Sequence, residues 1–172
     1  MRELADADRI TRLVRALGRA TKDETTCYLT GGATAVLVGW RATTVDVDLA
    51  FEPERDELLR ELPRLKDELR INVELASPAD FIPLPSGWRE RSPLVTQEGR
   101  LAVRHFDPAS QALAKLERGH DRDLADVQGL LAAGLVDAAG LRAAYDEIEG
   151  ELFRFPAVDP VSFRRRVNAL VG

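Results

Sequence analysis

The stretch TVDVDLAF, residues 44–51, alternates apolar and polar side chains and predicts a β-strand with Val45, Val47 and Leu49 on its buried face. The opposite face carries Asp46 and Asp48. Their carboxylates lie about 6.6 Å apart on that face, because a strand rises about 3.3 Å per residue. Aspartate is depleted in strands, and two like charges on one face repel each other. We therefore expect the pair to have a compensating partner.

The segments on either side of this strand suggest what that partner is. A Gly-Gly pair at residues 31–32 opens a predicted short helix, and backbone N–H groups at such a turn can bind an anion. A second alternating segment, RINVELA at residues 70–76, places Glu74 on its polar face. If the two strands align their polar faces, three carboxylates converge. Such a trio can share a proton or hold hard divalent cations, and the adjacent anion-binding turn favours cations that carry phosphates.

Composition bounds the class of protein. The chain has 172 residues with 45% hydrophobic and 31% charged residues, which indicates a folded globular domain. The net charge of −5 gives no overall basic signature of nucleic-acid binding. A single cysteine, Cys27, excludes an intramolecular disulfide and a multi-cysteine zinc site. We find no pattern typical of a signal peptide or a membrane span, and we expect a cytoplasmic protein.

Hydrophobic periodicity divides the chain into two parts of different character. Predicted helices and strands alternate in the first part: helices over 3–20, 33–40 and 53–69, and strands over 27–30, 45–51, 70–76, 94–97 and 101–106. The second part is rich in Ala and Leu and predicts four helices, the first capped by Asp107. We therefore predict an α+β fold with a small mixed β-sheet flanked by helices. Its α+β core covers residues 1–106, and an all-helical C-terminal subdomain covers residues 107–172.

The motifs carry a resemblance to a known group of enzymes. The order TGG, ATAVLVGWRATT and VDVDL over residues 30–49, followed by an acidic strand, resembles the DNA polymerase beta-like nucleotidyltransferase superfamily. The R-x-x-T before D-x-D, and the later AKLERGHDRDLAD at residues 114–126, resemble AbiEii/MenT-type enzymes, which are toxins of bacterial toxin–antitoxin and phage-defence systems. The resemblance covers residues 28–127. It implies a nucleotidyltransferase fold, an NTP substrate, Mg²⁺ or Mn²⁺, tRNA as acceptor and a cognate antitoxin as partner.

The resemblance also implies roles for individual residues. Asp46 and Asp48 match the metal-binding pair, and Glu74 matches the third carboxylate, a candidate base for the attacking hydroxyl. Lys115 matches the lysine that contacts the triphosphate, which makes it a candidate catalytic residue. The remaining matches are to substrate-binding elements: Gly31 and Gly32 to the phosphate-binding turn, Arg41 and Thr44 to the R-x-x-T element, and Asp123 and Asp126 to the polar RDxxD element. Many members have Gly-Ser at the turn. Here the hydroxyl that touches phosphate has to come from Thr30 or Thr34.

Simpler readings exist for several of these residues. Taken alone, Lys115 reads as a solvated helix residue, and Arg41 as a loop arginine that pairs with an acid. Asp123 and Asp126 are three residues apart and share one helix face, and one of them can cap the helix or pair with Arg122. His105 reads as a structural histidine, and Trp88 as a packing residue or a platform for a base.

We therefore predict a metal-dependent nucleotidyltransferase that moves NMP from an NTP to an acceptor hydroxyl and releases pyrophosphate, as a toxin acting on tRNA. Two alternatives stay open. One is a small-molecule or protein nucleotidylyltransferase, which the acidic net charge of −5 favours over tRNA binding. The other is a non-catalytic module that binds nucleotide or an antitoxin. The nucleotide, the acceptor and the oligomeric state cannot be predicted from the sequence.

Overall fold

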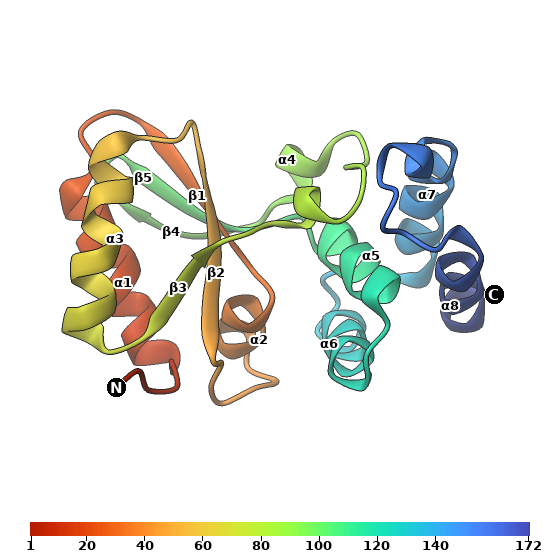
Figure 1. The fold of residues 1–172 in the computed structure, drawn as a ribbon, viewed down its shortest axis with the longest axis horizontal. Helices are drawn as coiled ribbons and strands as arrows, with labels where there is room; N and C mark the ends of the chain where they lie inside the picture. The colour runs from red at the N-terminus through yellow and green to blue at the C-terminus, as the bar shows by residue number, and fades with distance from the viewer. The chain divides into compact units, whose positions relative to one another are not determined.

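The computed structural model describes residues 1–172 and confirms the predicted α+β class, with a small mixed sheet flanked by helices and a helical C-terminal part. The sheet has five strands in the order β3-β2-β1-β5-β4 (Figure 1). Pairs β1–β2 and β4–β5 are antiparallel, whereas β2–β3 and β1–β5 are parallel. The strands are β1 (Thr25–Thr30), β2 (Asp46–Glu52), β3 (Asn72–Leu75), β4 (Leu94–Glu98) and β5 (Leu101–His105).

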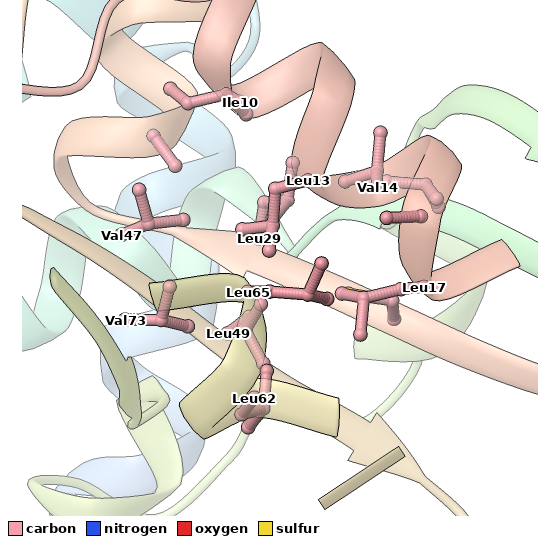
Figure 2. Packing of buried hydrophobic residues seen from close by; sticks show 14 of the residues in the cluster. Ile10, Leu13, Val14, Leu17, Leu29, Val47, Leu49, Leu62, Leu65 and Val73 are labelled. Carbon is pink, nitrogen blue, oxygen red and sulfur yellow. The ribbon is translucent and has the colours of Figure 1, made fainter. Parts of the chain in front are cut away.

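Two amphipathic helices cover one face of the sheet. Helices α1 (Ala7–Ala20) and α3 (Asp56–Leu69) lie side by side there (Figure 1). Their leucines meet the inward side chains of β1, β2 and β3, as Figure 2 shows for Leu13, Leu65 and Val47. The short helix α2 (Gly32–Val38) packs beside β1 and β2. The alternation in β2 therefore buries Val47 and Leu49 and turns the aspartates to the opposite face.

The chain forms two compact units. The first, which we call the sheet unit, consists of Met1–Ser77 and Pro93–His105. The second, the helical unit, consists of Pro78–Ser92 and Phe106–Gly172. The boundary predicted from the sequence, between an α+β core over residues 1–106 and a helical subdomain over residues 107–172, stays a prediction. The helical unit contains η1 (Pro78–Asp80), α4 (Trp88–Arg91), α5 (Pro108–Arg118), α6 (Asp121–Ala132), α7 (Ala138–Ile148), η2 (Glu149–Arg154) and α8 (Pro160–Val171).

Helix α5 is the centre of the helical unit and packs against α6, α7 and α8. Its first turn is capped by Asp107, whose carboxylate accepts hydrogen bonds from Ala109 N and Ser110 N. Its last turn is capped from α8, because Arg166 Nη1 donates to the carbonyls of Leu116 and Glu117. The two ends of α5 are therefore satisfied within this unit. None of the helices in the chain has the length and apolar character required to cross a bilayer.

Several local predictions differ from the structure. The helix expected over residues 3–20 begins at Ala7, and the strand expected over residues 70–76 covers only Asn72–Leu75. Val45 lies just before β2 and is 55% exposed, so the buried face of the strand begins one alternation later, at Val47. The helix expected from residue 53 begins at Asp56 and continues through Pro63 to Leu69. The helix tolerates this proline at its middle, because the missing N–H removes one intrahelical bond while Leu58, Leu62, Leu65 and Leu69 remain buried.

Candidate active site

The strand register gathers the predicted acids on one face of the sheet unit. Parallel pairing places Asp46 opposite Asn72 and Asp48 opposite Glu74. Antiparallel pairing of β1 with β2 places Thr30 opposite Asp48. The sheet therefore brings Asp46, Asp48 and Glu74 together on the face away from α1 and α3, and we call these three residues the carboxylate row. Both aspartates are half-buried, and Glu74 is exposed.

The compensating partner expected for the aspartates includes a neutral amide. Asn72 Nδ2 donates to Asp46 Oδ1 at 2.6 Å and to Glu74 Oε1 at 3.0 Å. One nitrogen with two hydrogens thus bridges two members of the carboxylate row. Asn72 was not among the predicted site residues. The alternation of β3 already placed it on the polar face, but only the pairing register shows that it stands opposite Asp46.

The Gly-Gly turn lies directly beside the row. Gly31 has φ of 62°, a left-handed conformation that favours glycine, and a Cβ there would lie 3.3 Å from Asp48 Oδ2. No side chain caps the start of α2, in contrast to α1 and α5, where Asp6 and Asp107 do so. Because α2 has only 7 residues, the local N–H groups of the turn matter more here than any helix dipole.

Gly32 fixes how the R-x-x-T element approaches the turn. A Cβ on Gly32 would lie 1.9 Å from Thr44 Oγ1 and 3.3 Å from an Arg41 guanidinium nitrogen, so the residue has to be glycine. Thr44 is held in turn by backbone hydrogen bonds to and from Ala5, and its hydroxyl donates to the carbonyl of Asp46 at 3.0 Å. Arg41 and Thr44 therefore lie at the Gly-Gly turn, next to the first residue of β2.

The two candidate threonines differ in their surroundings. Thr34 is fully buried, 3.4 Å from the carbonyl of Leu29 and 3.0 Å from His105 Nδ1. Its hydroxyl thus belongs to the interior of the sheet unit. Thr30 is also buried, but it pairs directly with Asp48 on the neighbouring strand. Burial of the imidazole lowers the pKa of His105 to about 4, so this histidine is neutral at pH 7.

The remaining predicted residues form a cluster in the helical unit. Lys115 Nζ lies 2.8 Å from Asp126 Oδ2 and 3.8 Å from Asp123 Oδ1, and all three side chains are buried. Arg118 also pairs with Asp123, which accepts a hydrogen bond from His120 N at the start of α6. The ammonium group of Lys115 is therefore fixed between two carboxylates. We call the buried side chains of Lys115, Asp123 and Asp126, together with the exposed Arg118 that pairs with Asp123, the buried charge cluster.

Trp88 contacts other residues of the helical unit on its ring faces. Its ring stacks on Phe106 at a centroid distance of 4.6 Å and an interplanar angle of 2°, and the Arg89 guanidinium lies 4.4 Å from its centroid. The neighbouring Arg91 forms a two-pronged contact with the fully buried Asp107, at 3.0 and 2.8 Å. These contacts give Trp88 a packing role, one of the two readings of the sequence.

The side chains of the carboxylate row do not form a complete cation site on their own. No group of three or more His, Cys, Asp or Glu side chains in the chain is arranged as a ready metal site. The oxygen donors of Asp46 and Asp48 nevertheless suit Mg²⁺, which is commonly held by one or two carboxylates together with substrate phosphates. The proximity of Asp48 Oδ2 to the Gly31 turn places such donors beside a possible phosphate position.

Comparison with known proteins identifies the family. No curated protein and no solved structure matches the chain. A family model described as a nucleotidyltransferase of unknown function (DUF6036) matches residues 7–155, a range that includes the whole carboxylate row, the Gly-Gly turn and the buried charge cluster. Since this match spans most of the sequence, the chain belongs to the DUF6036 family of nucleotidyltransferases.

Proposed function

We propose that the protein transfers a nucleoside monophosphate from an NTP to an acceptor hydroxyl at the carboxylate row. The observation that carries the proposal is the convergence of three acids beside a positive-φ glycine turn, in a family of nucleotidyltransferases. Acids alone would repel a triphosphate. Acids that lie next to backbone N–H groups make sense where a cation joins them to phosphate oxygens.

In the proposed reaction, the acceptor oxygen attacks the α-phosphorus, and the bond from that phosphorus to the pyrophosphate oxygen breaks. Asp46 and Asp48 orient the nucleotide, and the N–H groups of the Gly-Gly turn bind the departing phosphates. Glu74, the exposed member of the row, accepts the proton of the attacking hydroxyl. A divalent cation such as Mg²⁺ or Mn²⁺, held by Asp46 and Asp48, would offset the charge of the triphosphate.

For the acceptor we propose tRNA, with an antitoxin as protein partner, because the R-x-x-T and RDxxD elements resemble AbiEii/MenT-type toxins. The roles of Lys115, Asp123 and Asp126 towards the triphosphate stay predictions on the same basis. The net charge of −5 favours the second candidate, a nucleotidylyltransferase that modifies a small molecule or a protein, because tRNA binding benefits from a basic surface.

The experiment is incubation of the full chain with each labelled NTP, Mg²⁺ and total RNA, followed by separation of RNA, protein and small molecules. The wild type is expected to label tRNA, and Asp48→Asn is expected to reduce the rate at least about 100-fold. A matched control is Glu52→Gln, an acid on the same face of β2 that lies outside the carboxylate row.

Each outcome decides between candidates. If label appears in protein or small molecules and none appears in RNA, tRNA is not the acceptor and the second candidate function is favoured. Equal loss of rate in Asp48→Asn and Glu52→Gln would remove the special role of the row. If the wild type consumes none of the NTPs, the catalytic proposal is wrong and a non-catalytic nucleotide-binding or antitoxin-binding module takes its place.

A further inference from the structure

Asn72 stands inside the carboxylate row without being an acid itself. Its Nδ2 group donates to Asp46 Oδ1 and to Glu74 Oε1, and its backbone pairs with that of Asp46 across the β2–β3 register. We propose that Asn72 is a positioning residue of this site: its amide orients Asp46 for a divalent cation and compensates the charge of the row when no cation is bound. This inference rests on the proposed function.

The chemistry of the side chain supports an orienting role. An amide nitrogen carries two hydrogens, so one Nδ2 can satisfy two acceptors at once without adding a charge. Hydrogen bonds to a charged acceptor are stronger than those between neutral groups. By engaging Oδ1 of Asp46, the amide fixes the plane of that carboxylate. Outer partners that orient metal-binding side chains in this way contribute about 10–100-fold to metal affinity or activity.

The compensating role follows from the charges. Asp48 and Glu74 are directly opposite each other on adjacent strands, and Asp46 is two residues from Asp48 on the same face. Like charges at such positions destabilise a sheet. A lysine or arginine in place of Asn72 would neutralise the row but would also compete with a cation for the same oxygens. A neutral donor reduces the repulsion and leaves the net negative charge available for a cation.

Two substitutions separate these roles. Asn72→Ala removes the donor and leaves Asp46 free to rotate. Asn72→Asp keeps the shape of the side chain, replaces the donor with an acceptor and adds a fourth negative charge. The first substitution tests orientation of Asp46, and the second tests compensation of charge. Because Asp and Asn have the same size, the second variant also remains informative if the first fails to fold.

The affinity experiment is a titration of the full-length protein with Mn²⁺ alone, in which electron paramagnetic resonance measures the free ion. The dissociation constant of Asn72→Ala is expected to be about 10–100-fold higher than that of the wild type. The control is Asn168→Ala, which removes an asparagine whose Oδ1 accepts from Arg142 in the helical unit. It is expected to bind Mn²⁺ as the wild type does.

The stability experiment compares thermal unfolding of Asn72→Asp and the wild type with EDTA and with excess Mn²⁺. In EDTA the variant is expected to melt about 2–4 °C below the wild type, the shift expected for about 1 kcal/mol in a domain of this size. Mn²⁺ is expected to narrow that difference, because a cation compensates the added charge. An unchanged difference in the two conditions would overturn the compensating role.

The outcomes also distinguish this inference from the proposed function. If the wild type binds Mn²⁺ and Asn72→Ala binds it with the same dissociation constant, Asn72 does not orient Asp46 and the proposed function is unaffected. If the wild type itself does not bind Mn²⁺ and labels no acceptor, the proposed function fails and this inference fails with it. A weaker affinity of Asn72→Ala, together with an unchanged affinity of Asn168→Ala, supports the inference.

Discussion

The chain holds acidic side chains in two contrasting ways. In the sheet unit, Asp46 and Glu74 are half-buried or exposed, and a neutral amide bridges them. In the helical unit, Asp123 and Asp126 are almost fully buried and pair with Lys115 and Arg118. The acids of the buried charge cluster are already neutralised by cations of the chain itself. Asp46 and Glu74 instead share a neutral donor, which leaves their negative charges in place.

The difference separates a structural use of carboxylates from a binding use. Removing one partner from a buried ion pair leaves an uncompensated charge in a medium of low polarity, which is strongly destabilising. Removing one acid from a half-exposed row instead relieves repulsion. We therefore expect substitutions in the helical unit to lower stability, and substitutions in the carboxylate row to lower activity.

The largest expected effect on stability is that of Asp126→Ala. Its removal leaves the Lys115 ammonium group buried with only the more distant Asp123 beside it, at 3.8 Å. We expect the free energy of unfolding to fall by about 3–5 kcal/mol, the usual effect of breaking a buried pair, measured by urea denaturation. Asp121→Ala, which removes an exposed acid from the first turn of the same helix, is the control.

Lys115 offers a second check on the same pair. The double variant Asp126→Ala/Lys115→Met removes both charges and is expected to recover most of the stability that Asp126→Ala loses. If Asp126→Ala changes the free energy of unfolding no more than Asp121→Ala does, the buried charge cluster is not a stabilising network and the contrast between the two regions fails.

A smaller effect concerns a buried titratable group without a charged partner. The pKa of His105 is about 4 in the folded chain, because burial disfavours the imidazolium, and an unperturbed histidine has a pKa of about 6.5. The unfolded chain therefore takes up a proton first as the pH falls. The contribution of His105 therefore lowers the free energy of unfolding as the pH falls from about 6.5 to about 4. At pH 5 this loss is about 2 kcal/mol.

The measurement is urea denaturation of the wild type and His105→Asn at pH 7 and pH 5. The wild type is expected to lose about 2 kcal/mol more than the variant between these values, since Asn cannot titrate. An equal loss in both proteins would show that His105 takes up its proton alike in the folded and unfolded states. That result would contradict its burial beside Thr34.

The smallest expected effect is that of Asp48→Asn on stability without divalent ions. Neutralising Asp48 removes its repulsion with Glu74 on the adjacent strand, and we expect the free energy of unfolding to stay constant or to rise by up to about 1 kcal/mol. Urea denaturation in EDTA measures it. A fall of more than 1 kcal/mol would indicate that Asp48 is a structural acid like those of the helical unit.

Patterns local in sequence predicted much of the fold. Alternation over residues 44–51 placed β2, and the strands expected on each side of residues 98–100 are β4 and β5. Asp107 and Pro108 marked the start of α5. The fold class was predictable for the same reason. The hydrophobic periodicity of each helix or strand can be read from its own residues, without knowing which elements pack together.

Contacts between distant segments could not be predicted in this way. The polar face of RINVELA was evident, but the bridge from Asn72 to Asp46 depends on the register of β2 with β3. Likewise, Lys115 and Asp126 lie on different helices, and their pairing depends on how α5 packs against α6. The stack of Trp88 on Phe106 also joins segments that sequence patterns treat separately.

The arrangement of the two units along the chain constrains the order in which they can be completed. Strand β1 needs β5 as its parallel neighbour, so the sheet stays incomplete until the ribosome has released residues 101–105. By then Pro78–Ser92, which belongs to the helical unit, has already been synthesised without its partners α5 and α7. A fragment that ends at residue 105 therefore contains all of the sheet unit together with Pro78–Ser92, which has no helical unit to pack against. The complementary C-terminal fragment lacks Pro78–Ser92.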